Sequence, residues 1–218
     1  MKKLIIIFIL CLLLFGCGKK EDKKEDIVNS KTITKVDINK DYVYESNFKN
    51  LFLLDGSEYI MSIPTINLNS DDASNINLEI KNEYNNKYKK YVLNGNVINT
   101  GYLINNSYHV NDNIISIVLK YSYYLSGTIS DEKDLTYNLS INDGKLLNND
   151  ELLEYFNIDE DYLYDYIKNN SNSIDADYII MNIKNNSYYL YINNDNELVV
   201  IYYEIYDNDS IRKELVIN

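Results

Sequence analysis

Few residues of this chain are suited to nucleophilic chemistry. The sequence holds two cysteines, Cys11 and Cys17, and a single histidine, His109. His109 stands in a strand-like stretch with no nucleophile beside it, and the sequence contains no G-x-S-x-G elbow. A Ser–His pair brought together by folding, or a Ser–Lys pair that needs no histidine, are alternatives that the sequence leaves open. We interpret His109 as an ordinary surface or hairpin residue.

The metal-ligating side chains also form no recognisable motif. One histidine without an available thiolate cannot build the usual zinc tetrahedron. Oxygen-bearing residues alternate in two places, which suits calcium better; these are Asn193, Asp195 and Glu197, then Asp207 and Asp209. Neither run has the glycine and the terminal glutamate of an EF-hand loop, and both fit hairpin turns. We therefore predict no metal and no other cofactor.

Paired carboxylates are harder to judge from sequence. Among 33 acidic residues, some pair will lie by chance at a separation that suits glycoside hydrolysis. A carboxylate-dependent hydrolase acting on cell-wall polymers is therefore the alternative function. Tyrosine-rich strands could stack on sugar rings, but alternating tyrosines such as Tyr121, Tyr123 and Tyr202 favour core and cross-strand packing. On balance the sequence predicts a protein that is not an enzyme.

The N-terminus has the three parts of a secretory signal. Lys2 and Lys3 are followed by an apolar stretch from Leu4 to Phe15, and the small residue Gly16 precedes Cys17. The apolar stretch is about a dozen residues long, too short for a helix that must cross roughly 30 Å of hydrocarbon. That length disfavours the alternative, a short transmembrane anchor. We predict that residues 1–16 are a signal peptide.

The segment Leu14-Phe15-Gly16-Cys17 resembles the lipobox of bacterial lipoproteins. In that family the cysteine thiol receives a diacylglycerol and becomes the new N-terminus after cleavage. The resemblance implies that Cys17 is lipidated and that two acyl chains hold the protein at the bacterial cell membrane, with its domain on the extracytoplasmic side. Cys11 leaves with the signal peptide, so the mature chain has no second cysteine for an internal disulfide.

Charged and polar residues follow the lipidation site. Residues 18–40 are rich in Lys, Asp, Glu, Ser and Thr with scattered Ile and Val, which predicts that residues 17–40 are the lipidated cysteine and a flexible charged tether. A charged helix in KKEDKKED is the alternative, but it has nothing apolar to pack against. Residues 41–218 are long enough for one domain with a substantial core.

The charge of the chain limits its partners. The formal charge is −12, and the signal peptide takes away two lysines and no acidic residue. The mature chain then has 19 basic and 33 acidic residues, a formal charge of −14. So acidic a surface argues against binding nucleic acid or anionic lipid and favours cationic partners.

Short β-type runs dominate the predicted domain. Candidate strands lie at residues 42–45, 51–54, 59–66, 101–110, 114–124, 135–141, 188–192, 198–206 and 212–217. Pro64, which cannot donate a ladder hydrogen bond, suits an edge strand or a strand end. Because hairpin connections predominate, we expect these strands to form one largely antiparallel sheet.

Three helices are predicted among the strands. Ser70 is a candidate N-cap, and it is followed by apolar residues at helical spacing, namely Ala73, Ile76, Ile80, Tyr84 and Tyr88. Two short helices begin at Asn149 and after Asp159, the second running to about Asn169. The predicted fold class is α+β: a mostly antiparallel sheet with one main helix packed on it and two short helices.

Several of these segments together resemble a known family. They are Ser62–Ile66, Ile76–Ile80, Asn113–Ile117, Thr136–Leu139, Asp143–Leu147 and Asp150–Leu153. In order they are similar to the "P-x-I … I-N-x-x-I" opening, a central strand and the turn-rich later section of the PdaC/RsiV-type extracellular domain. The resemblance spans residues 41–218 and implies that fold.

Two members of this family have known roles. In a peptidoglycan deacetylase the domain precedes a separate catalytic domain, and in a lysozyme-sensing anti-sigma factor it binds lysozyme outside the cell. This chain ends at Asn218 and has a lipid anchor in place of a transmembrane helix, so we expect neither the enzymatic nor the transcriptional role. We predict a monomeric, non-enzymatic envelope lipoprotein that binds a cationic protein such as a lysozyme, or cell-wall glycan. A passive assembly role is a further alternative.

Overall fold

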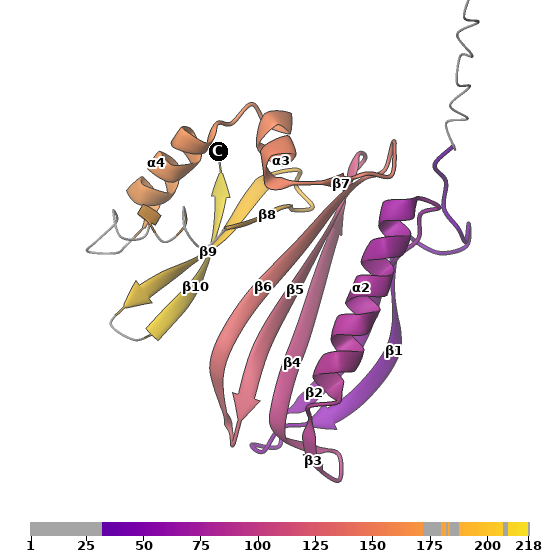
Figure 1. The fold of residues 1–218 in the computed structure, drawn as a ribbon, viewed down its shortest axis with the longest axis vertical. Helices are drawn as coiled ribbons and strands as arrows, with labels where there is room; N and C mark the ends of the chain where they lie inside the picture. Colours follow the sequence, from indigo (N-terminus) through magenta and orange to yellow (C-terminus); the bar gives the residue numbers. More distant parts are fainter. Residues whose placement is uncertain (1–31, 172–179, 182, 184–187, 207–208, 218) are drawn as a thin grey trace, which may run out of the picture. The chain divides into compact units, whose positions relative to one another are not determined.

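The computed structural model describes residues 32–217 except 172–179, 182, 184–187 and 207–208. Its strands form two sheets (Figure 1). The larger sheet has the order β2-β1-β4-β5-β6-β7, with β3 paired to β4, and the smaller has the order β10-β9-β8. The bounds in the larger sheet are β1 Val43–Phe52, β2 Glu58–Ile66, β3 Val92–Asn94, β4 Val97–Val110, β5 Ile114–Leu125, β6 Thr128–Ser140 and β7 Leu146–Leu147. Those in the smaller sheet are β8 Tyr189–Ile192, β9 Leu198–Tyr206 and β10 Asp209–Ile217.

Almost every pairing is antiparallel, as predicted. Among the described strands, the one parallel contact is a single bridge between Phe52 of β1 and Val97 of β4. Pro64 pairs with Glu45 inside β2, which is the edge strand of the larger sheet. The prediction of an edge position is therefore confirmed, and the missing N–H of Pro64 breaks no ladder on the open side.

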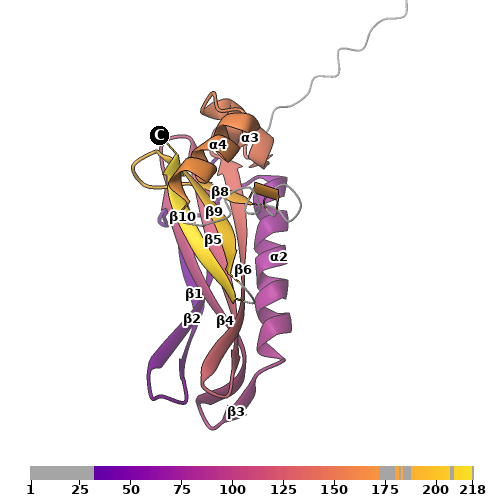
Figure 2. The same cartoon turned by 90° about the vertical axis from the view of Figure 1, so that its left-hand side faces the viewer.

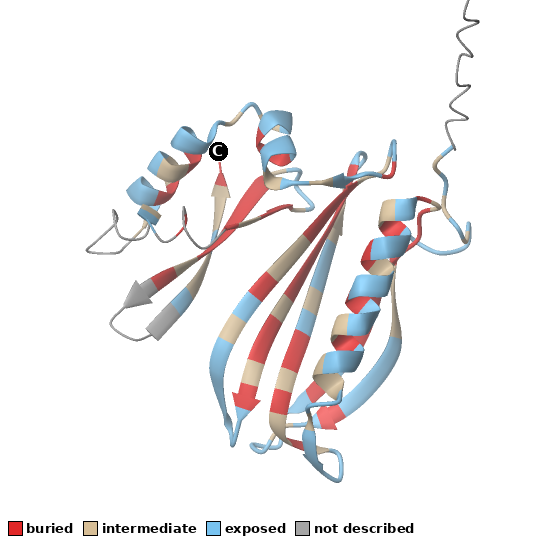
Figure 3. Ribbon diagram, in the orientation of Figure 1, coloured by how far each residue is buried: buried red, intermediate tan, exposed pale blue. Residues whose placement is uncertain are grey.

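Helix α2, Asp71–Tyr88, packs on one face of the larger sheet (Figure 1). The predicted N-cap is present: the Ser70 hydroxyl accepts a hydrogen bond of 3.1 Å from the backbone N–H of Ala73. The apolar stripe of the helix is buried in the core, as Figure 3 shows along its sheet-facing side. The predicted packing of this helix on the sheet is confirmed.

The smaller sheet covers the opposite face of the larger one at β5 and β6. Successive residues of β5 alternate between two cores: Ile117 packs in the core beneath α2, and Val118 packs against Tyr191 and Val199 of the smaller sheet. In Figure 2 the strands β8–β10 lie over β5 and β6. Ser116 adds a polar link, because its hydroxyl accepts a hydrogen bond of 3.0 Å from the N–H of Ile192.

Two short helices pack on the smaller sheet. They are α3, Asn149–Tyr155, and α4, Glu160–Asn170, and their buried leucines and isoleucine share a core with β8 and β9. Asn148 closes a capping box with Glu151, and the Asp159 side chain caps α4. Residues 180, 181 and 183 are also helical. The α+β class, with mostly antiparallel strands, is confirmed.

The prediction of one sheet was wrong, since the described strands divide between two. Several strand bounds also differ from the predicted ones. The candidates at 42–45 and 51–54 are one strand, β1, whose register with β2 shifts between Ser46 and Lys49, where Asn47 has a φ of 55°. The polar residues around this bulge are exposed, so they lack the apolar alternation that marks a strand.

The predicted strand at 135–141 begins at Thr128 instead. Ser126 and Gly127 have φ values of 48° and 101° and form the turn that joins β5 to β6. The first residues of β6 are mainly exposed and polar. They therefore lack the alternating apolar pattern from which a strand is predicted.

The folded unit begins at Thr32, earlier than the predicted boundary at residue 41. The buried Asn67 side chain accepts a hydrogen bond of 2.8 Å from the Asp37 N–H and donates one of 3.0 Å to the Asp41 carbonyl. Asn69 accepts one of 2.9 Å from the Thr34 N–H. Residues 32–40, which we expected to belong to the tether, are thus bonded to the domain, because two asparagine side chains satisfy some of their backbone groups. No described helix has the length and apolar character needed to cross a membrane.

Candidate functional site

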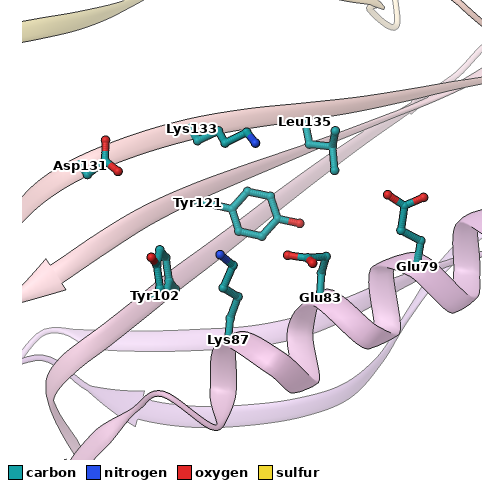
Figure 4. Close-up of a pocket in the computed structure, with 8 residues that line it drawn as sticks. All are labelled: Glu79, Glu83, Lys87, Tyr102, Tyr121, Asp131, Lys133 and Leu135. Atoms are coloured by element: carbon teal, nitrogen blue, oxygen red, sulfur yellow. The ribbon is translucent and has the colours of Figure 1, made fainter.

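A cavity of about 330 Å³ opens between α2 and strands β4–β6 (Figure 4). We call it the α2 groove. It is lined by three residues of α2, Glu79, Glu83 and Lys87; by Tyr102 of β4 and Tyr121 of β5; and by Asp131, Lys133 and Leu135 of β6. Pockets that bind small ligands have volumes of about 300–1,000 Å³, so the groove has room for a small ligand or for a few side chains of a larger one.

The helix positions its three groove residues by their spacing. Glu79, Glu83 and Lys87 recur every four residues and therefore lie on one side of α2. Each glutamate immediately precedes a residue of the buried stripe, Ile80 or Tyr84, so the row lies at the border between core and solvent. With a rise of about 1.5 Å per residue, the row extends for about 12 Å along the helix.

Tyr121 contributes a buried hydroxyl to the groove. The side chain is 6% exposed, and its hydroxyl has no hydrogen-bond partner among the described residues. In Figure 4 this hydroxyl points towards the side of the groove where Glu79 and Glu83 lie. Burial, and then the charges of Glu83 and Glu79, raise the pKa of the Tyr121 hydroxyl, so it stays protonated. An unsatisfied buried hydroxyl costs about 1–3 kcal/mol, which a ligand that pairs with it would partly recover.

Tyr137 has a similar position in the neighbouring strand. It is 6% exposed, and its hydroxyl also lacks a hydrogen-bond partner in the described part of the chain. Burial, followed by the interaction of this hydroxyl with the Glu79 carboxylate and then by the charge of that carboxylate, raises the pKa of Tyr137. Two neutral tyrosine hydroxyls thus lie close to the acidic part of the groove.

The groove also contains positive charge. The Lys87 ammonium lies 4.0 Å from the centre of the Tyr102 ring and 5.7 Å from the centre of the Tyr121 ring. These distances fit cation–π contacts. Lys133 approaches the Tyr121 ring from β6, opposite Lys87 (Figure 4). Glu79, Glu83 and Lys87 form no ion pair with another described residue, so their charges are not neutralised within the fold.

Such a lining is suited to binding. Its residues include carboxylates, ammonium groups and phenols, and none of them is a cysteine, a histidine or a serine. The sequence contains three S-x-x-K spacings: Ser210 to Lys213 on strand β10, and Ser46 to Lys49 and Ser130 to Lys133 on strands β1 and β6. In the last two, the serine hydroxyl donates to a backbone carbonyl over 3.4 Å, that of Ile63 for Ser46 and that of Tyr123 for Ser130. Neither serine therefore presents its proton to a lysine base.

The structure places His109 between the two sheets. His109 is half-buried in β4, and its ring stacks on that of Tyr191 with 5.2 Å between centres and 23° between planes. Ser116 lies opposite it in register, but the Ser116 hydroxyl donates to Asn138 over 2.6 Å and accepts from the Ile192 N–H. This serine therefore serves the packing of the sheets.

The remaining candidate residues from the sequence are the possible calcium ligands and Cys17. Asn193 to Glu197 form the β8–β9 turn, where the Asn193 side chain accepts hydrogen bonds of 3.0 and 2.9 Å from the N–H groups of Asp195 and Glu197. The hairpin interpretation is confirmed there. No cluster of three or more His, Cys, Asp or Glu side chains suited to a metal occurs in the described ranges. Cys17 and Asp207 lie outside the described residues.

The α2 groove itself was missed at the sequence level. The four-residue spacing of Glu79, Glu83 and Lys87 was a signal that could have found its helical side. The contribution of β6 could not be found, because the predicted strand began at Leu135 and left Asp131 and Lys133 outside it. Tyr121 packs in the core as predicted, and its free hydroxyl becomes visible only in three dimensions.

No protein-family model matches the chain, and no curated protein matches it with significant similarity. The resemblance to PdaC/RsiV-type domains depends on the sequence motifs and stays a prediction.

Proposed function

We propose that the protein is a non-enzymatic, lipid-anchored binding protein of the bacterial cell envelope, whose domain binds a cationic protein of lysozyme type. The observation that carries this proposal is the α2 groove. There Glu79 and Glu83 have no partner in an ion pair, and the Tyr121 hydroxyl beside them has no partner in a hydrogen bond. Polar groups left unpaired in a formed cavity are typical of a site that a ligand completes.

The chemistry of the acidic end favours a basic side chain as the bound group. A lysine ammonium or an arginine guanidinium placed there donates hydrogen bonds to both carboxylates and to the Tyr121 oxygen. The ring of Tyr121 offers an aromatic face to the same cation. Both glutamates and the tyrosine oxygen would then be satisfied together.

The overall charge of the mature chain supports the same class of partner. A mature chain with a formal charge of −14 attracts a basic protein over several ångströms and speeds their encounter. The attraction is screened within about 8 Å at physiological ionic strength. Binding that depends on it must therefore weaken as salt is added.

Isothermal titration calorimetry of the full-length chain in neutral detergent with a lysozyme tests the proposal. We expect binding at low ionic strength and a dissociation constant that rises steadily with added salt. No heat at low salt would contradict it. So would binding to isolated peptidoglycan without binding to the lysozyme, because the ligand would then be cell-wall glycan.

The hydrolase alternative makes a different prediction. A zymogram with peptidoglycan embedded in the gel should show no clearing at the position of this protein. Clearing that is lost on Glu83→Gln would replace the binding role with carboxylate-dependent hydrolysis.

A further inference from the structure

Four of the five charges that line the α2 groove are sorted along its length, and the fifth, Asp131, lies beyond the lysines at the end away from Glu79 (Figure 4). Glu79 and Glu83 lie on the side to which the Tyr121 hydroxyl points (Figure 4). Lys87 and Lys133 lie beside the Tyr121 ring, one on each wall of the groove. A ligand that presented only positive charge would meet two ammonium groups at this second position. The lining is therefore complementary to a ligand with both signs of charge.

We propose that the α2 groove binds an extended segment of the partner protein that carries a basic and an acidic side chain two residues apart. The inference rests on the proposed function and specifies what its site recognises. The basic side chain contacts Glu79, Glu83 and the Tyr121 oxygen, and the acidic one lies between Lys87 and Lys133.

The spacing of two residues in the ligand follows from comparing the rise of a helix with the rise of an extended chain. Glu83 and Lys87 are four residues apart in α2, which separates them by about 6 Å along the axis. In an extended chain, residues two apart project from the same side and are separated by about 6.6 Å. A Lys-x-Glu or Arg-x-Asp segment lying along the helix thus matches both the positions and the signs of the groove charges.

The Lys87 ammonium is held in a position where it can contact the acidic side chain of the ligand. Its ammonium already lies over Tyr102, and the side chain is half-buried. Holding a long side chain in one place lowers the entropy cost of forming an ion pair. Lys81 is a suitable control, because it lies on the same helix and is exposed but lines a different pocket, beside β1 and β2.

The test uses capped pentapeptides and NMR titration of the full-length chain in neutral detergent at low salt. The peptides have the sequences Ala-Lys-Ala-Glu-Ala, Ala-Lys-Ala-Gln-Ala and Ala-Lys-Ala-Lys-Ala, each acetylated and amidated. We expect the Lys/Glu peptide to bind about tenfold more tightly than either of the others, with shifts centred on Glu83, Lys87 and Tyr121. A difference of tenfold corresponds to one added ion pair in a partly desolvated site.

Two variants test whether Lys87 itself, rather than the net charge of the protein, causes the preference for the Lys/Glu peptide. Lys87→Met should abolish the preference for the Lys/Glu peptide, whereas Lys81→Met, with the same change of charge, should keep it. Equal or tighter binding of the Lys/Lys peptide to the unaltered chain, or an unchanged preference in Lys87→Met, would overturn the inference. Either result leaves lysozyme binding intact, so it is distinct from failure of the proposed function. The expected peptide preference without any lysozyme binding would keep the site and remove that partner.

Discussion

The Arg212 guanidinium of β10 donates a hydrogen bond of 2.8 Å from Nε to Oδ2 of Asp134 in β6, and so joins the two sheets. Asp134 is fully buried, and the Tyr203 hydroxyl also donates to it. Arg212 is the only arginine of the chain, and it also contacts Glu214 over 2.7 Å. Burial, with the added charge of Asp134, raises the pKa of Tyr203. This cluster holds the smaller sheet on the larger one.

Removing the guanidinium should destabilise the domain strongly. Arg212→Met leaves the Asp134 carboxylate buried without its countercharge, and we expect a loss of about 3 kcal/mol in the free energy of unfolding. Urea denaturation followed by circular dichroism measures it. The double change Asp134→Leu with Arg212→Met should recover most of the loss, because no uncompensated charge remains. A single change that cost less than about 1 kcal/mol, the range of an exposed pair, would contradict a buried ion pair.

Acid should weaken the domain partly through Glu132. Burial acts to raise the pKa of this carboxyl, but hydrogen bonds from Lys120 and Ser122 outweigh it and lower the pKa below its ordinary value of 4.5. The stabilisation is therefore present above pH 4.5 and is lost as the pH falls through the lowered pKa. In urea melts across this range, Glu132→Gln should show a shallower loss of stability than the unaltered chain. Identical slopes would show that the Glu132 contact contributes nothing.

Alkali should weaken the domain partly through Tyr59, which joins β2 to β4. Its hydroxyl donates to the Ile104 carbonyl over 2.9 Å, and burial raises its pKa from 10.0 to about 12. The neutral form is favoured in the folded state, so this contribution is complete below pH 10 and is lost as the pH rises towards 12. Tyr59→Phe should be less stable at neutral pH yet lose less stability between pH 10 and 12. A variant with the same alkaline slope would place the titrating group elsewhere.

The proposed membrane anchor depends on Cys17. Cys17→Ser removes the thiol proposed to accept the lipid, and the protein should then keep its signal peptide and migrate as the larger, unprocessed precursor. Metabolic labelling with a tagged fatty acid should mark the unaltered chain and leave the variant unlabelled. A Cys11→Ser variant is the control and should behave like the unaltered chain. Labelling of the Cys17 variant with the fatty acid, or normal removal of its signal peptide, would contradict lipidation at Cys17.

The sequence was most informative where local signals agreed with burial. Helix α2 was predictable because Ser70 is a clear cap and its apolar stripe has one period. The hairpin turn at Asn193 was predictable because its side chain satisfies the backbone locally. The division into two sheets was not, because in β5 Ile117 and Val118 are both apolar, which indicates that both faces are covered without saying by what. The Asp134–Arg212 pair joins residues 78 apart, and only tertiary structure shows it.

In the candidate site, too, only the part determined by local sequence could be predicted. Its helical row has a spacing that can be read along the chain. Its opposite wall comes from the charged start of β6, which has no hydrophobic pattern. The unpaired hydroxyl of Tyr121 depends on what surrounds it after folding, so no pattern of residue types predicts it.

The most direct test of the binding role compares two variants with equal changes of charge. Glu79→Gln with Glu83→Gln neutralises the acidic end of the α2 groove, and Glu154→Gln with Asp165→Asn neutralises two exposed acids on α3 and α4. In calorimetry with a lysozyme at low salt, we predict that the groove variant binds at least tenfold more weakly and that the control loses no more than about twofold. Equal weakening in both variants would show that net charge alone drives the encounter, and it would contradict the assignment of the groove as the binding site.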